Sequence, residues 1–487
     1  MVFDIPLCMI IAFLLSIVLI AHYAIRTRVT SFRPYAVGNR AFSTANLIAT
    51  VLATYYGGGT MMSYITQFSD GIFWVSWRIF GVMAAFFTLS WLSMRMANFI
   101  YHISMPETMG RVYGKYPRII TAVLNICYST VVIAMQIRIM SQVIGVCITS
   151  ASPLAITILT TLLVVAYAIF GGIRAIVLTD IWQCITFSIL ICCLAWFMFK
   201  KTDVSFSETI VLTAAQKKFG LSYLLLHDRK LVAILRYLST FFYCIEPTFV
   251  HNIYMSSGMH QSKKMFLYAG ILGAIIMVCL SLVGLFISTW VPSNLSKIEI
   301  WDYIIAHSSP LLKGLICICI LAMTMSTADS RLHICSVMVS YDIVPNILPM
   351  RLRRKLSLVD HYRIAHMAIL FLAIVAIPLA LTNSYFIADQ FSRFYGRLYA
   401  PIVVAPFILA VLGFRSGQRT VLIGMVAGAL SVFAWRKWIY PLLGTNDGLF
   451  PCMLVNGLVM LGIHYLWPHR NHIKASKVLS YFFQKKH

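Results

Sequence analysis

The chain has 487 residues, of which 60% are hydrophobic and only 11% are charged, and its mean hydropathy is +0.84. Soluble globular proteins carry about 25% charged residues, so this composition excludes that class and predicts an all-α polytopic membrane protein. The formal net charge of +24 is explained better by basic cytoplasmic loops than by nucleic-acid binding, and we expect no nucleic-acid partner.

Thirteen apolar segments are long enough to cross a lipid bilayer as helices. They cover residues 4–25, 43–66, 72–94, 118–148, 153–170, 176–199, 232–250, 265–290, 313–341, 364–382, 386–412, 419–435 and 449–467. Because their number is odd, the termini are expected on opposite sides of the membrane. With the N-terminus outside, the cytoplasmic segments carry 23 Lys and Arg residues and the outer loops carry 10. The positive-inside rule therefore predicts N-out and C-in topology, and we expect location in the cytoplasmic (plasma) membrane.

The second segment contains the run Ala53-Thr54-Tyr55-Tyr56-Gly57-Gly58-Gly59-Thr60. Each glycine disfavours a helix by roughly 1 kcal/mol relative to alanine. Inside lipid, freed backbone groups are tolerated only where they line a protected cavity or bind something. One interpretation is a discontinuous helix whose carbonyls hold a cation or solute near the midplane. The other is a close-packing face of small residues.

The fifth and sixth segments meet at a Gly171-Gly172 turn, and Asp180 follows within the next helix. A carboxylate near a helix N-terminus is favoured by the helix dipole, so Asp180 is either an anchoring acid or a cation relay near the inner mouth.

The seventh segment contains Glu246-Pro247 in an apolar context. Proline removes a helical hydrogen bond, and an intramembrane acid costs ~2.5 kcal/mol or more unless it is paired or hydrated. This is a second interrupted segment, five after the first. Such a pair is typical of an inverted-repeat transporter with its site between the two breaks.

The ninth segment places five hydroxyl or carboxyl side chains between Thr324 and Ser330. Hydroxyls in membrane helices often bond to their own helix. Alternatively, Ser326 and Thr327 supply two oxygens to a hard cation, and carbonyls near the glycine break supply the others. In the eleventh segment, Arg393 and Arg397 lie one turn apart and require an acidic partner, such as Asp389 or Glu246, or an anionic ligand.

Three stretches together resemble the sodium:solute symporter family, which includes proline, pantothenate, choline, sugar and sialic-acid carriers. The first is Gly171-Gly172-Ile-Arg-Ala-Ile-Val-Leu-Thr179-Asp180-Ile-Trp-Gln183, which is very close to the family signature. The second is Met325-Ser326-Thr327-Ala328-Asp329-Ser330, and the third runs from Ala53 to Gly71.

The resemblance implies the leucine-transporter type of fold within a single transporter domain, 1–487. Its two five-helix inverted repeats would be 43–199 and 232–412. Residues 1–25 and 419–467 would form peripheral helices, and 468–487 a basic cytoplasmic tail. The resemblance also implies alternating access driven by a sodium gradient, with Na⁺ as coupling ion and no other cofactor.

The resemblance further implies which residues bind sodium. The expected ligands are the carbonyls of Leu52, Tyr55 and Met323 and the hydroxyls of Ser326 and Thr327. Asp180 matches the family's signature aspartate, which is thought to help sodium leave inward.

These observations favour sodium-coupled symport of a small organic solute of the amino-acid or carboxylate class. The expected solute contacts are Tyr56, Gly57, Gly58, Gly59, Thr60, Phe242, Tyr243, Glu246, Arg393 and Arg397. Where the proline carriers have Gln-Pro-His, this chain has Glu246-Pro247-Thr248, so the resemblance does not identify the solute. The alternatives are a proton-coupled carrier that uses Glu246 and a transporter-like sensor. An enzyme is not expected, because the sequence offers no nucleophile–base set, phosphate loop or metal cluster.

Overall fold

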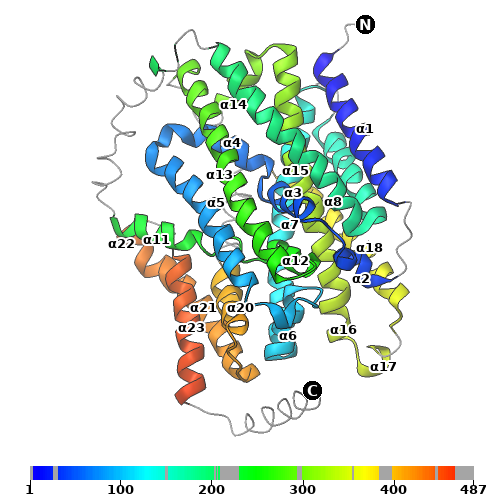
Figure 1. Cartoon of the computed structure of the whole chain (residues 1–487), viewed down its shortest axis with the longest axis vertical. Helices are drawn as coiled ribbons and strands as arrows, with labels where there is room; N and C mark the ends of the chain where they lie inside the picture. The colour runs from blue at the N-terminus through cyan, green and yellow to red at the C-terminus, as the bar shows by residue number, and fades with distance from the viewer. Residues whose placement is uncertain are drawn as a thin grey trace.

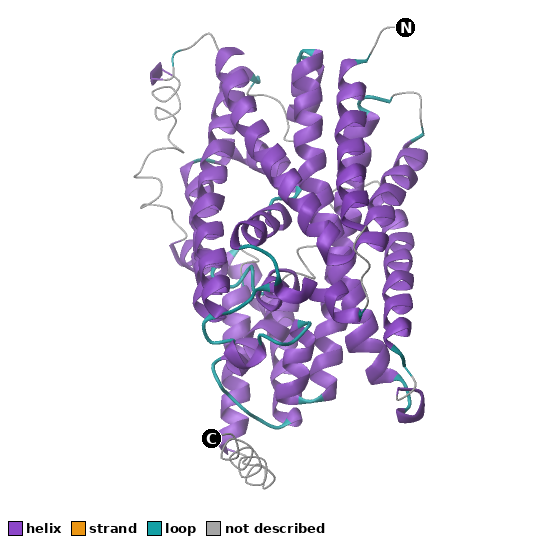
Figure 2. Ribbon diagram, turned by 45° about the vertical axis from the view of Figure 1, so that its right-hand side comes forward, coloured by secondary structure: helices purple, strands orange, loops and turns teal. Residues whose placement is uncertain are grey.

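The structure is a computed structural model that describes residues 4–25, 31–148, 152–201, 205, 207–208, 230–292, 299–353, 356–382, 398–444 and 448–466. Within these residues every regular element is a helix (Figure 2). The α-helices are α1 (Ile5–Ile25), α2 (Phe32–Val37), α3 (Thr44–Tyr55), α4 (Gly58–Gln67), α5 (Ile72–Ser93), α6 (Met105–Tyr113), α7 (Lys115–Gly145), α8 (Pro153–Lys201), α11 (Lys230–Thr240), α12 (Pro247–Met255), α13 (Met259–Trp290), α14 (Glu299–Ala306), α15 (Pro310–Val337), α16 (Val344–Ile347), α17 (Met350–Arg353), α18 (Leu358–Leu381), α20 (Ala405–Val411), α21 (Gln418–Ala434), α22 (Tyr440–Leu443) and α23 (Leu449–Leu466). Short 3₁₀ or π-helical turns accompany them at η1 (Gly38–Arg40), η2 (Phe68–Asp70), η3 (Ala97–Phe99), η5 (Met338–Ile343), η6 (Ala400–Val404) and η7 (Trp435–Ile439).

The predicted membrane segments are present as helices. Nine helices of the described part are long and apolar enough to cross a membrane. Four shorter apolar helices are Thr44–Tyr55, Pro153–Ala166, Leu231–Thr240 and Ala400–Val411. Each of the thirteen predicted segments overlaps one of these helices, so the all-α polytopic prediction is confirmed. Arg393, Arg397 and the tail 468–487 lie outside the described residues.

The start of the first described helix and the end of the last lie on opposite sides of the molecule. α1 begins near its upper end and α23 ends near its lower end (Figure 1). This arrangement agrees with an odd number of spans. The side that faces the cytoplasm stays a prediction.

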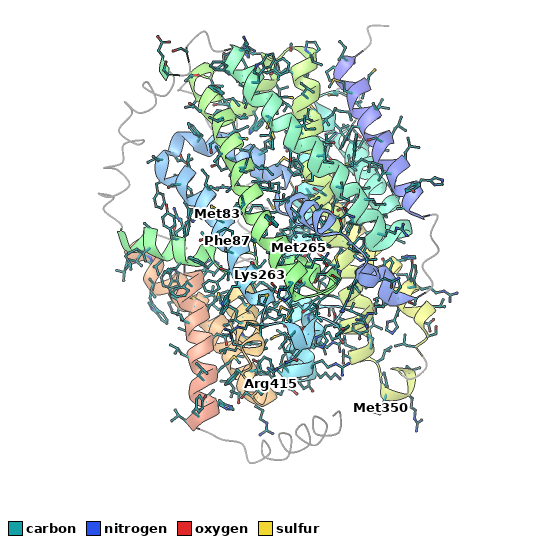
Figure 3. The ribbon with its side chains drawn as sticks, viewed as in Figure 1. Met83, Phe87, Lys263, Met265, Met350 and Arg415 are labelled. Carbon is teal, nitrogen blue, oxygen red and sulfur yellow. The ribbon has the colours of Figure 1, made fainter. Side chains whose placement is uncertain are left out.

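Helix α15 is the central helix of the bundle. In the membrane-length window of its span, 78% of the residues are buried, against 28% for α1 and for α23. It packs against α1, α3, α7 and α8. Beside this group α5 packs along α13, where the Ser90 hydroxyl donates to the carbonyl of Lys263 at 2.9 Å. Figure 3 labels Met83 and Phe87 of α5 near Met265 of α13. The helices α1 and α23 are the most exposed of the long apolar helices in the described chain; their assignment as peripheral helices stays a prediction.

Two spans are interrupted, as the sequence predicts. α3 and α4 are separated at Tyr56 and Gly57, and α11 and α12 are separated by residues 241–246. The two breaks lie five segments apart, which is the relation expected of inverted repeats. The repeat boundaries themselves, 43–199 and 232–412, stay a prediction.

The joint between the fifth and sixth segments depends on Gly172. Here α8 bends, and Gly172 has φ 55° and ψ −163°, a conformation that disfavours L-residues with a side chain. A Cβ atom at this position would lie 2.8 Å from Cδ2 of Tyr35. Both the backbone angle and the packing therefore require glycine at this turn.

We predict that Gly172→Ala destabilises the protein by about 1–2 kcal/mol, because of the positive φ angle, and by more if Tyr35 cannot shift. The matched control is Gly457→Ala in α23, where a Cβ atom meets nothing within 4 Å. The apparent unfolding temperature of the purified protein in detergent measures both effects. Equal temperatures for the two variants would contradict this account of the joint.

Candidate functional site

The break in the second segment frees backbone carbonyls in the middle of the bundle. Tyr56 ends α3 with φ −88° and ψ 82°, and Gly57 precedes α4 with φ −77° and ψ 159°. The Gly57 N–H bonds to the carbonyl of Tyr55 at 3.2 Å. In a continuous helix it would bond instead to the carbonyl of Ala53, which is therefore available to another donor.

Two hydroxyls of α15 face this break. The Ser326 hydroxyl donates to the carbonyl of Ala53 at 2.8 Å, and the Thr327 hydroxyl to the carbonyl of Thr54 at 3.3 Å. Both hydroxyls also lie close to the Met323 carbonyl, at 3.1 Å and 3.0 Å. Ser326 is fully buried and Thr327 nearly so. The two segments therefore bring several oxygen atoms together, which is the ligand type that a hard cation prefers.

The carbonyls expected from the resemblance lie beside those that the hydroxyls contact. The Leu52 carbonyl accepts from the Tyr56 N–H at 3.0 Å, and the Tyr55 carbonyl accepts from the Gly57 N–H at 3.2 Å. Each oxygen has a second lone pair, so these bonds leave both able to coordinate an ion. Their role as ligands, like that of Met323, stays a prediction.

A cavity of about 570 Å³ adjoins the break. Of the predicted solute contacts, it is lined by Gly57, Gly59, Thr60, Phe242, Tyr243 and Glu246. It is also lined by the predicted ion ligands Tyr55 and Thr327, and by Trp77, Tyr128, Gln136 and Arg331. The oxygen cluster and the cavity thus share one wall.

Two predicted solute contacts, Tyr56 and Gly58, are not among the residues that line this cavity, and their role in solute binding stays a prediction. Tyr56 is fully buried and donates its hydroxyl to the carbonyl of Gly273 at 2.5 Å. Gly58 faces α15, where an added Cβ atom would lie 2.3 Å from Cγ2 of Thr324. Tyr56 therefore anchors α3 to α13, and Gly58 serves the close packing that was the alternative interpretation of this run.

Glu246 is paired with an arginine to which the sequence analysis assigned no role. Arg331 lies on α15 and donates through Nη2 to Oε1 of Glu246 at 2.7 Å. Its guanidinium also lies 5.1 Å above the ring of Tyr128 and donates to Ser129 Oγ at 3.4 Å. Both charged side chains are 7% exposed. The sequence analysis predicted that Glu246 could pair with an arginine, but it named Arg393 or Arg397 as the partner. Both of these arginines lie outside the described residues.

Gln136 of α7 is a second residue that the sequence analysis missed. An added Cβ atom on Gly57 would lie 3.0 Å from Nε2 of Gln136 and 3.2 Å from Oγ1 of Thr327. The Gln136 Oε1 atom is buried and has no hydrogen-bond partner among the described residues. An amide in the middle of a predicted membrane span was the available signal, because polar groups there often have a function.

Asp180 lies two turns after the bend in α8, close to Thr50, Asp329 and Ser330. It is fully buried, and neither carboxyl oxygen has a hydrogen bond of normal geometry within the described chain. Ser330 in turn accepts from the Thr54 hydroxyl at 3.1 Å. Asp180 is therefore next to the ion-site segments, which fits the predicted relay better than an anchoring acid in the first helical turn.

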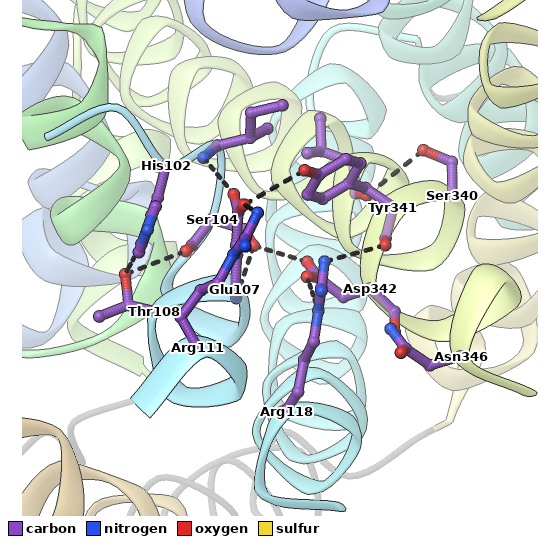
Figure 4. Close-up of polar contacts among 12 residues, drawn as sticks. His102, Ser104, Glu107, Thr108, Arg111, Arg118, Ser340, Tyr341, Asp342 and Asn346 are labelled. Carbon is purple, nitrogen blue, oxygen red and sulfur yellow. Dashed lines mark hydrogen bonds and ion pairs between the residues drawn. The ribbon is translucent and has the colours of Figure 1, made fainter. Parts of the chain in front are cut away.

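A second polar network ties α6 and α7 to the far end of the α15 span (Figure 4). Arg118 Nε donates to Asp342 Oδ1 at 2.7 Å, and the Ser104 hydroxyl donates to Asp342 Oδ2 at 2.7 Å. The Tyr341 hydroxyl donates to Glu107 Oε1 at 3.2 Å. Asp342 is fully buried. These contacts hold three helices together at the ends that are predicted to face the cytoplasm.

In a comparison with known proteins, the profile of one family matches most of this chain. The profile of the sodium:solute symporter family matches residues 35–428. A sodium/proline symporter of Staphylococcus aureus is 26% identical over 308 residues, which cover 60% of this chain. The matched region spans only 57% of that relative's length.

Solved structures with the same fold cover nearly the whole chain. A substrate-bound, outward-open Na⁺-coupled sialic acid symporter has a TM-score of 0.76 at 17% identity, and the match covers 94% of this chain and 95% of that one. Mhp1, a nucleobase-cation-symport-1 family transporter, has a TM-score of 0.63 at 13% identity, with coverage of 91% and 97%. MhsT in complex with L-phenylalanine has a TM-score of 0.54 at 12% identity, with coverage of 88% and 99%. The fold is therefore the predicted leucine-transporter type.

We predict that Arg118→Met destabilises the protein by about 3–5 kcal/mol, because Asp342 remains buried without its counterion. The control is Arg111→Met. Arg111 is 69% exposed and lies 3.7 Å from Glu107, so its loss should change stability by at most about 1 kcal/mol. Unfolding temperatures in detergent compare the two variants. Similar losses in both would show that the Asp342 pair does not hold this end of the bundle.

Proposed function

The chain belongs to the sodium:solute symporter family, and from that premise we propose that it is a sodium-coupled secondary active symporter. It takes up a small organic solute of the amino-acid or carboxylate class across the plasma membrane, by alternating access. The observation that carries the proposal is the contact of Ser326 and Thr327 with the freed carbonyls of Ala53 and Thr54.

The chemistry of this cluster supports a sodium ion over a proton. A hard monovalent cation prefers carbonyl and hydroxyl oxygens, and the cluster contains both types from two separate helices. The proton-coupled alternative requires Glu246 to exchange protons freely, whereas Glu246 is held by Arg331 at 2.7 Å. We therefore favour sodium as coupling ion, with Asp180 on its inward exit route.

The position of the cavity supports coupling between ion and solute. Thr327 belongs to the oxygen cluster and also lines the cavity, so an ion there stabilises the wall that the solute contacts. A volume of about 570 Å³ lies within the range of small-molecule sites. The amino-acid class draws further support from the relative named sodium/proline symporter.

Alternating access requires the helix bundle to open at its cytoplasmic end as well as at its outer end. The Asp342 network closes the end of α15 that is predicted to be cytoplasmic. We propose that these contacts separate when the ion and solute move inward. A coupling of ~1–3 kcal/mol between the two sites is typical of linked binding.

We predict that sodium, but not potassium or choline, raises the unfolding temperature of the purified protein. A ligand at 100 times its Kd stabilises by about 2.7 kcal/mol. Thr327→Val and Ser326→Ala should each abolish the sodium response. The control Thr324→Val removes a hydroxyl whose hydrogen bonds among the described residues go to its own helix, at Ile320 and Leu321, and it should retain the response.

The same variants test transport. In proteoliposomes, an inward sodium gradient should drive uptake of label from a mixture of ¹⁴C-labelled amino acids and short carboxylic acids, and Thr327→Val should abolish it. A sodium response that survives in both Thr327→Val and Ser326→Ala would refute this ion site.

A further inference from the structure

We propose that the Glu246–Arg331 ion pair binds the charged groups of the solute in the cavity, and we call this pair the clamp. It selects zwitterions, which carry an ammonium and a carboxylate together. This inference rests on the proposed function, because it names the solute class of the same cavity.

The pair stands where a solute must bind. Glu246 directly precedes α12 at the break of the seventh segment, and Arg331 lies one helical turn after Thr327 on α15. Both residues line the cavity, and their charged atoms are 2.7 Å apart. The pair therefore connects the second interrupted span to the helix that carries the ion-site hydroxyls.

Three residues that line this cavity each carry a buried polar atom that the described chain leaves unsatisfied. Arg331 Nε, Trp77 Nε1 and Gln136 Oε1 have no hydrogen-bond partner among the described residues. The first two are donors and the third is an acceptor. Buried polar atoms are almost always satisfied, so this set is completed by a solute that brings acceptors, such as a carboxylate, and a donor, such as an ammonium group.

Charge balance then decides between classes of solute. A bare carboxylate bound to Arg331 displaces Glu246 and leaves that acid buried without a counterion. A bare amine bound to Glu246 leaves Arg331 in the same position. Separating a buried pair in this way is strongly unfavourable. A zwitterion inserted between the two residues gives each charge a new partner and adds no net charge.

Two further arginines line the cavity. The Arg236 guanidinium lies 4.6 Å from the ring centre of Trp74, and that of Arg78 lies 5.7 Å from the ring centre of Tyr64. The clamp requires an ammonium group in addition to a carboxylate, so an anion alone is not held.

The test uses the purified full-length protein in sodium and three matched probes of similar shape. L-Proline carries both charges, pyrrolidine carries only the amine, and cyclopentanecarboxylate carries only the acid. L-Leucine, isoamylamine and isocaproate form a second trio, and the other proteinogenic amino acids, glycine betaine and glucose complete the panel. We expect at least one zwitterion to raise the unfolding temperature in sodium. Its amine and acid counterparts should bind about 100-fold more weakly or worse.

Single variants should change the preference in opposite directions. In Glu246→Gln, the acid probe supplies the partner that Arg331 has lost, so its affinity should rise above that of the unaltered protein. In Arg331→Gln, the amine probe should gain in the same way. A purely structural role would predict loss of every response and no gain.

The double variant Glu246→Gln/Arg331→Met leaves no buried unpaired charge and so protects folding. Sodium should raise the unfolding temperature of this double variant, and the zwitterion should not. The proposal is overturned if no zwitterion stabilises the unaltered protein, if an acid, an amine or glucose stabilises it as well as the zwitterion does, or if the double variant keeps the zwitterion response. A missing sodium response in the unaltered protein refutes the proposed function instead.

Discussion

The absence of water in the bilayer core is the constraint on which this structure depends. A helix that breaks there exposes carbonyls that only protein or a ligand can satisfy. The break at Tyr56 and Gly57 frees the carbonyls of Ala53 and Thr54. These carbonyls accept hydrogen bonds from the hydroxyls of Ser326 and Thr327 on α15. The two helices are therefore held together by groups that are equally suited to an ion. Removing the break would remove both the contact and the site.

One helical span contributes to three polar features described above. The α15 span carries the hydroxyls of the proposed ion site, Arg331 one turn later and, in the π-helical turn that follows, Asp342. It is also the most buried of the long apolar spans in the described chain. Because this span contacts the proposed ion site, the cavity and the Asp342 network at once, a change at one of them can reach the others without a separate relay.

The sequence predicted the elements better than their partners. Segment lengths, the glycine run and Glu246-Pro247 are local signals, and each described segment and both breaks appear where they were expected. The directions of side chains are not local. Tyr56 anchors to Gly273, far along the chain, and nothing near Tyr56 in the sequence reveals that contact. The roles of Arg331 and Gln136 were missed for the same reason, because each depends on neighbours that only the folded bundle supplies.

Glu246 illustrates how a partner changes the meaning of a residue. A single carboxyl at a helix break in a membrane suggests a proton carrier, since an unpaired charge there is costly. Beside Arg331 the same carboxylate becomes half of an ion pair, which is a neutral unit. Such a unit resists any solute that carries only one charge, and it needs no change in overall charge to release a solute that carries two. In the proposed function, the arginine that argues against proton coupling through Glu246 is thus also the group that gives the cavity a basis for selecting its solute.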